Sequence, residues 1–205
     1  MAFGKHWEWR GFGHPVPQLR ERIASLSAAP VGAGDILDVY LWAPGAGENV
    51  KLRFGHLKFK RLLQRDGELE CWLEEESEVY PFPLQPRVVA RLAAALGVRF
   101  PSLPEVPLDH QGFTALLKET DPAVSRVLVH KRRTLHGLPL SSGEVVLVEL
   151  TEILRPEAVI TVALEHEQAQ AVQAALDILH PVEAGLEAMS YLQALAEWAQ
   201  GRTLS

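Results

Sequence analysis

The sequence predicts an α+β protein built on antiparallel strands, several of which carry Lys and Arg on one shared face. Three observations lead to this prediction. Apolar and polar residues alternate over many short segments, which is typical of half-buried strands. Turns rich in Gly and Pro separate neighbouring segments, so that consecutive strands run antiparallel. Stretches with apolar residues at helical spacing lie among the strands.

Composition limits the classes of function. A chain of 205 residues with 47% hydrophobic content is long enough for one sizeable core, so we expect a single domain over residues 1–205. The net charge of −6 disfavours the diffuse positive field of a nucleic-acid-binding protein. The single Cys71, the absence of an apolar leader and the lack of a long apolar run predict a cytoplasmic protein without a membrane partner.

The first half of the chain, about residues 1–98, is expected to hold most of the early strands. Pro86 and Gly97 mark the start and the end of its second helix. The predicted elements are a strand at 5–10, a helix at 17–27, strands at 36–42, 50–54, 57–60 and 69–73, and a helix at 85–96.

A proline-rich connector, about residues 99–124, joins this half to a second half at about 125–205, and a short helix fits residues 112–119. Leu186, Met189, Leu192 and Leu195 form a helical stripe in a last helix that we expect to begin at Pro181. The other predicted elements are strands at 127–135, 145–150 and 159–164 and a helix at 167–179.

The first candidate site is His6-x-Glu8-x-Arg10. Alternate residues of a strand project to the same side about 6 to 7 Å apart, close enough to share a metal and an anion. Glu8 suits a hard cation, Arg10 suits a phosphate oxygen, and His6 suits a transition metal. The alternative is an ordinary amphipathic strand with its two tryptophans in the core.

The second candidate is a set of four cations on two neighbouring strands: Lys51, Arg53, Lys58 and Lys60. Like charges side by side in a sheet are unfavourable unless an anion or facing carboxylates compensate them. A solvated outer face is equally compatible with the pattern. Arg61 and Arg65 extend the basic run, but they share the face of Lys60 only if the strand bends or bulges.

The third candidate is the basic strand that ends in Lys131-Arg132-Arg133. Alternation places Lys131 and Arg133 on one side and His130 and Arg132 on the other. Both sides are basic, so the sequence leaves open which pair points inward. A solvent-facing edge or a weak nucleic-acid patch remains an alternative.

Acidic residues of the late strands can hold Mg²⁺ or Mn²⁺, which prefer oxygen ligands, or can neutralise the cations. Glu149 shares the phase of Val145 and Leu147 and is the acidic residue most expected to point into a mixed interior. Glu165 and Glu167 either join it or begin the next helix, and the helix start is slightly favoured. The remaining acidic candidates are Glu144 and Glu152.

The order of these pieces resembles the CYTH, or triphosphate tunnel, superfamily, which includes class IV adenylate cyclases, thiamine triphosphatases and inorganic triphosphatases. His6-x-Glu8-x-Arg10 stands at the family's ExExK strand, and residues 38–44 match DxYxxxP. Residues 51–53 and 57–60 match its RxR-type and LxxK-type strands. The late basic strand, Glu149 and a final Glu-x-Glu follow in the family's order, so the resemblance covers nearly the whole chain. P-loop, nucleophile-elbow and zinc-like patterns are missing from the sequence.

The resemblance implies an antiparallel, barrel-like tunnel with a polar lumen and helices packed outside it. It also implies a triphosphate or polyphosphate ligand beside a Mg²⁺ or Mn²⁺ ion, and Glu8 and Glu149 as catalytic residues. The phosphate-binding residues implied are Arg10, Lys51, Arg53, Lys58, Lys60, Lys131 and Arg133. The metal ligands implied are His6, Glu8, Glu149, Glu165 and Glu167.

Two functions follow as alternatives. One is a metal-dependent phosphohydrolase that acts on a triphosphate. The other is a catalytically degenerate relative that binds a phosphorylated ligand or a partner protein, with a homodimer as one form of partner. His6 favours the second, because an imidazole replaces a hard oxygen ligand and weakens Mg²⁺ binding.

Overall fold

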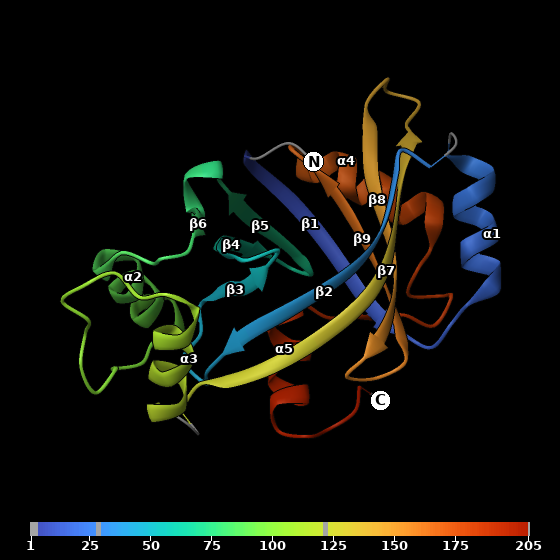
Figure 1. Ribbon diagram of the computed structural model, residues 1–205. Coiled ribbons are helices and arrows are strands. Elements are labelled where there is room, and N and C mark those ends of the chain that lie inside the picture. Colours follow the sequence, from blue (N-terminus) through green and yellow to red (C-terminus); the bar gives the residue numbers. More distant parts are fainter. Residues whose placement is uncertain (1–3, 28–29, 121–122, 205) are drawn as a thin grey trace.

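The computed structural model describes residues 4–27, 30–120 and 123–204. Figure 1 shows long curved strands with helices around them. The described residues form these strands: β1 (Gly4–Gly13), β2 (Gly32–Trp42), β3 (Glu48–Arg53), β4 (His56–Asp66), β5 (Leu69–Glu74), β6 (Val79–Pro81), β7 (Ser125–Pro139), β8 (Val145–Arg155) and β9 (Val159–His166). A two-residue strand, β10 (Glu187–Ala188), follows them.

Eight of the strands close into an antiparallel barrel. Neighbours follow the order β1-β5-β4-β3-β2-β7-β8-β9, and β9 pairs back with β1. The closing pairs run from Trp7 opposite His166 to Gly13 opposite Ile160. Closure gives each of the eight strands a neighbour on both sides, and interior side chains alternate with exterior ones along the strands. The predicted α+β tunnel with helices outside is confirmed.

Two groups of helices cover different parts of the barrel's outer surface (Figure 1). α1 (Pro17–Leu26) and α4 (Ala169–Leu179) bury apolar residues against β1, β8 and β9, including Trp9 and Val162. α2 (Pro86–Leu96) and α3 (His110–Glu119) pack on β3 and β4, where Val50 and Leu57 are fully buried. The predicted connector thus contributes α3 to this second layer. Among the described residues, no helix is long and apolar enough to cross a membrane.

The last helix, α5 (Tyr191–Ala199), caps one end of the barrel. Its Tyr191 and Trp198 pack edge-on against Phe12 of β1, with ring centroids 5.5 and 5.9 Å apart. Tyr40 of β2 stacks on Tyr191 at 5.1 Å. The same apolar cluster includes Val129. An aromatic plug therefore closes one end of the lumen.

The prediction of a last helix that begins at Pro181 is wrong. His180 adopts a left-handed conformation (φ 46°) at the end of α4, and turns and β10 occupy the next residues. α5 begins only after Ser190, whose hydroxyl accepts from the backbone N–H of Gln193, while the Gln193 side chain accepts from the Ser190 N–H. This reciprocal cap is a sequence signal for a helix start. Leu186, although it is spaced as in a helix, lies just before β10.

Candidate functional site

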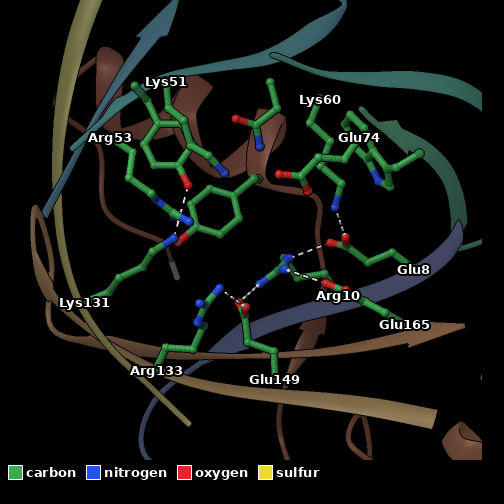
Figure 2. A pocket seen from close by; sticks show the side chains of 14 residues that line it. Glu8, Arg10, Lys51, Arg53, Lys60, Glu74, Lys131, Arg133, Glu149 and Glu165 are labelled. Atoms are coloured by element: carbon green, nitrogen blue, oxygen red, sulfur yellow. Dashed lines mark hydrogen bonds and ion pairs between the residues drawn. The ribbon is translucent and has the colours of Figure 1, made fainter. Parts of the chain in front are cut away.

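The barrel encloses a polar cavity to which every barrel strand contributes at least one side chain (Figure 2). Its free volume is about 40 Å³, room for only a few waters at roughly 10–15 Å³ each. Six Lys and Arg side chains and four Glu side chains line it: Arg10, Lys51, Arg53, Lys60, Lys131, Arg133, Glu8, Glu74, Glu149 and Glu165. The lumen is thus filled largely by its own charged side chains.

The structure resolves which side of β7 faces inward. Lys131 and Arg133 line the cavity, and Lys131 is only 3% exposed. His130 and Arg132 lie on the outer surface, where both pair with Asp35 of β2, at 2.6 and 3.6 Å. The register of β7 against β8 shifts between His130 and Lys131. Val127 and Val129 share the inward side, where they pack in the aromatic plug.

Three carboxylates from the neighbouring strands β8, β9 and β1 form one side of the lumen, which we call the acidic wall: Glu149, Glu165 and Glu8. The Arg10 guanidinium lies among them. Its Nε donates to Glu8 Oε1 at 2.7 Å and its Nη1 donates to Glu149 Oε1 at 3.2 Å. Lys60 donates to the other oxygen of Glu8, and Arg133 Nη1 donates to the other oxygen of Glu149 at 3.3 Å.

The pKa values of the acidic wall reflect this unequal pairing. Burial alone would raise the pKa of Glu8, but Arg10 and Lys60 outweigh it and hold that pKa well below its usual range. Burial also opposes ionisation of Glu149, yet Arg10, Lys131 and Arg133 lower its pKa to about 2. Glu165 lies 3.9 Å from Arg10 Nη2, and burial together with Glu8 and Glu149 raises its pKa to about 7.

Three cations from β3 and β7 form the opposite side, which we call the basic wall: Lys51, Arg53 and Lys131. Between these strands, β2 supplies the fully buried Asp38. Arg53 donates to both oxygens of Asp38, each at 2.6 Å, and Lys131 Nζ lies 3.2 Å from Oδ2. Among the residues that the structure describes, Lys51 has no ion-pair partner. The basic wall therefore carries more cations than carboxylates.

The electrostatics of Lys51 follow from this surplus. Burial first, and then the charge of Arg53, lower the pKa of Lys51 to about 7. The charges of Glu74 and Asp38 offset this only in part, and the ring centre of Tyr40 lies 5.8 Å from Lys51 Nζ. Lys131 is better satisfied, because its Nζ donates to the hydroxyl of Tyr40 at 3.2 Å. An anion beside Lys51 would favour its charged form.

One group in the described part of the chain has the composition of a cation site: His6, Glu8 and Glu165, with one ligand atom from each within 4.8 Å of one another. Glu8 and Glu165 are direct partners across the β1–β9 pairing. The buried Nε2 of His6 has no hydrogen-bond partner among the described residues. Burial and the charge of Lys60 lower the pKa of His6, which keeps the imidazole neutral and able to bind a metal. The residues present fit a divalent cation.

Other predicted site residues lie away from this cavity. Lys58 is partly buried and is paired with Lys51 across β3 and β4, but it does not line the lumen. Glu152 faces outward and pairs with Arg20 of α1. Glu167 is exposed in the turn between β9 and α4. The favoured reading of Glu165 as a helix start is wrong, because β9 continues through it and Leu147 pairs opposite it.

Five lumen residues were not predicted from the sequence: Tyr40, Asn49, Trp72, Glu74 and Tyr191. Asn49 shares the strand phase of Lys51 and Arg53, so alternation could have identified it. Its buried Oδ1 has no hydrogen-bond partner among the described residues. Glu74 shares the phase of Trp72 on β5. No local signal marks Tyr191, because only the position of α5 brings it to the lumen.

Comparison with known proteins places the fold. The sequence matches no protein-family model and no curated protein. Among solved structures, HpAC1 from Hippeastrum, described as a putative adenylyl cyclase with a dominant triphosphatase activity, superimposes with a TM-score of 0.56. The match covers 97% of each chain at 14% sequence identity. The chain has a CYTH-like fold.

A conserved hypothetical protein from Pyrococcus furiosus is a more distant structural match. Its TM-score is 0.46 at 14% identity, over 91% of this chain and 98% of the other. At such low identity, structural likeness establishes the fold alone. The function of this chain must be argued from its own lumen.

Proposed function

We propose that the protein binds a triphosphate or short polyphosphate in its barrel lumen and hydrolyses it with the help of a divalent cation. The observation that carries the proposal is the basic wall, where Arg53 and Lys131 share the single carboxylate of Asp38 and the buried Lys51 has no ion-pair partner among the described residues. Buried charges that lack compensation are costly, so this surplus is best explained by an anionic ligand. A linear phosphate chain supplies several negative charges, and the lumen side chains must move apart to admit it because the free volume is only about 40 Å³.

The two walls have different roles in this proposal. The basic wall binds phosphate oxygens, and Arg53 is already oriented for them by its two bonds to Asp38. On the acidic wall, Glu149 holds the guanidinium groups of Arg10 and Arg133 from both sides. Fixed donors of this kind stabilise charge on a phosphoryl group without reorganising during the reaction. Glu149 thus acts as a positioning residue for two phosphate-binding arginines.

The cation would be held by His6, Glu8 and Glu165 at the edge of the same wall. When bound, a divalent cation neutralises phosphate oxygens and activates water for attack on phosphorus. Lys60 donates to one oxygen of Glu8. We expect Lys60 to move from that oxygen to a phosphate oxygen when the site fills. The imidazole of His6 favours Mn²⁺ over Mg²⁺, since Mg²⁺ prefers oxygen ligands.

Phosphate release tests the hydrolytic part of the proposal. Purified protein should release orthophosphate from tripolyphosphate, ATP or thiamine triphosphate, faster with Mn²⁺ than with Mg²⁺. Glu149→Gln keeps the side-chain shape but removes the charge that orients Arg10 and Arg133, and it should lower kcat by about 10²-fold or more. Folded protein that releases no phosphate from any of the three substrates would contradict hydrolysis.

Binding without hydrolysis is the second candidate function, and His6 is the observation that favours it. The protein would then bind a phosphorylated ligand or a partner protein as a catalytically inactive relative. His6→Glu separates the two candidates. Metal-dependent turnover gained by His6→Glu would identify a degenerated enzyme, whereas continued inactivity with retained tripolyphosphate binding would identify a binding module.

A further inference from the structure

A second cavity of about 360 Å³ adjoins the lumen, and we call it the side chamber. It lies between the β4–β5 hairpin and the start of α5. It is lined by Glu8, Arg10, Arg65, Gly67, Glu68, Glu70, Ala188, Met189, Ser190 and Gln193. Its volume falls in the range of about 300–1,000 Å³ that is typical of small-molecule pockets. The space inside the charged lumen is much smaller.

The chamber exists because β1 changes its partner on this side of the barrel. β5 pairs with β1 only from Gly4 to Glu8, and the short β10 pairs with Gly11 and Phe12. The two partners leave a space over the middle of β1. A register shift in β4 between Leu62 and Gln64 lets Arg65 pair with Glu70, at 2.9 Å, within the chamber. The bulge brings Arg65 to the side chamber, where its side chain stays largely exposed, and not into the lumen with Lys60.

Glu8 and Arg10 are the only residues that line both the chamber and the lumen, within the described part of the chain. Their side chains are joined by the 2.7 Å bond from Arg10 Nε to Glu8 Oε1. One ion pair therefore forms the boundary between the two cavities. A ligand that separates this pair would lie on both sides of the boundary, with one end against Arg10 in the lumen.

The chamber has a different chemistry from the basic wall. Its two arginines, Arg65 and Arg10, are each paired with a chamber carboxylate, and Glu68 is an additional acid that accepts from the indole N–H of Trp9. Burial raises the pKa of Glu70, although the charge of Arg65 opposes this shift. Ser190, Gln193 and the thioether of Met189 add neutral surface. Such a chamber disfavours a phosphate and suits a neutral or cationic group.

We infer that the side chamber is a subsite for the organic group of an organic triphosphate, and that this group is neutral or cationic. The inference rests on the proposed function, because the triphosphate itself must lie in the lumen. It makes the preferred ligand an ester such as a nucleoside triphosphate rather than an inorganic polyphosphate. The phosphates would then lie in the lumen and the organic group in the side chamber, beside the start of α5.

Binding measurements on variants that fill the chamber test this inference. Met189→Trp enlarges a side chain that lines the chamber, and Gly67→Asn adds one at a left-handed position (φ 59°) that asparagine tolerates. The probes are tripolyphosphate, ATP with its neutral organic group and thiamine triphosphate with its cationic one. Both variants should weaken at least one organic triphosphate by about tenfold and change tripolyphosphate binding by less than about twofold.

Gly55→Asn is the matched control, because Gly55 has a similar left-handed backbone (φ 73°) in another hairpin turn, does not line the chamber, and has the same open surroundings as Gly67. It should leave the binding of all three probes unchanged. Unaltered protein that binds tripolyphosphate but neither organic triphosphate would overturn this inference alone. Equal weakening of all three probes, or no weakening by either variant, would do the same. Unaltered protein that binds none of them would overturn the proposed function and this inference with it.

Discussion

The two walls of the lumen are built alike but compensated differently. Each is formed by three neighbouring strands, β8, β9 and β1 for the acidic wall and β3, β2 and β7 for the basic wall. On the acidic wall, both oxygens of Glu8 and of Glu149 accept from Lys or Arg side chains. On the basic wall, a single Asp38 serves Arg53 and Lys131, and Lys51 has no ion-pair partner among the described residues.

This difference makes the proposed anion site compatible with a net charge of −6. The surplus of positive charge is local, within one side of a closed barrel, where a low dielectric strengthens each interaction. In the proposed function, the acidic wall supplies fixed arginines and a cation site, while the basic wall supplies positive charge that is only partly compensated. The comparison predicts that substitutions on the two walls have different effects on stability and on anion binding.

The largest expected effect is on the stability of the basic wall. Asp38→Asn removes its carboxylate and leaves buried cations that repel one another, so we expect the free energy of unfolding to fall by about 3–5 kcal/mol. Chemical denaturation measures this change. Added tripolyphosphate should restore more stability to Asp38→Asn than it adds to the unaltered protein, because it replaces the missing negative charge.

Asp35→Asn is the control for this substitution. Asp35 lies on the same strand but on the outer surface, where water screens its pairs with His130 and Arg132. Its substitution should change stability little and should not alter the response to tripolyphosphate. Equal destabilisation by the two variants would contradict the view that Asp38 compensates a buried cationic wall.

The next effect concerns the pH dependence of anion binding. Lys51 has a pKa lowered to about 7 by burial and by Arg53, so it is charged below that pH and increasingly neutral above it. A bound anion favours the charged form, and the affinity for tripolyphosphate should fall by about tenfold from pH 6 to pH 8 through this group. Calorimetric titration of the unaltered protein and Lys51→Met isolates this contribution, because the titration of the ligand is common to both.

The free energy of unfolding has the opposite pH dependence to the affinity for the anion. The unfolded chain keeps the ordinary, higher pKa of lysine and binds more protons than the folded protein between pH 7 and that value. The free energy of unfolding should therefore rise with pH through this window. Lys51→Met should remove the rise. An affinity for tripolyphosphate with the same pH profile in both proteins would contradict a titrating Lys51 in the lumen.

The smallest effect concerns the choice of cation. His6→Glu replaces a nitrogen ligand by oxygen beside Glu8 and Glu165, and it should raise the affinity for Mg²⁺ relative to Mn²⁺ by about tenfold or less. Competition between Mg²⁺ and Mn²⁺, followed by the electron paramagnetic resonance of free Mn²⁺, measures the ratio. His14→Glu adds the same charge at an exposed loop and should leave the ratio unchanged.

Much of the fold could be predicted from local patterns. Alternation identified the strands because each barrel strand has one face in the polar lumen and one under helices or in solvent, and this gives a period of two. The failure at Pro181 has a physical cause. Leu186 and Met189 have helical spacing with Leu192. Residues 187 and 188 nevertheless pair with β1 as the strand β10, and the helix begins only after the cap at Ser190.

The site was predictable only in part. Phase alone grouped Lys51 with Arg53, and Lys131 with Arg133, but it could not decide which face of β7 points inward, since both faces are basic. Lys58 has the same phase as Lys60 and still lies outside the cavity, where β6 pairs with β4. The pairing of Asp38 with Arg53 and the side chamber depend on tertiary placement, and no spacing in the sequence encodes them.

Tripolyphosphate binding to two neighbouring arginine variants tests the central claim most directly. Arg133 faces the lumen and Arg132, the next residue, faces the outer surface, so Arg133→Met and Arg132→Met remove the same charge on opposite sides of one strand. Calorimetry should show that Arg133→Met weakens binding by about tenfold or more, whereas Arg132→Met changes it by less than about twofold. Equal weakening by the two variants, or stronger weakening by Arg132→Met, would contradict an anion site inside the barrel.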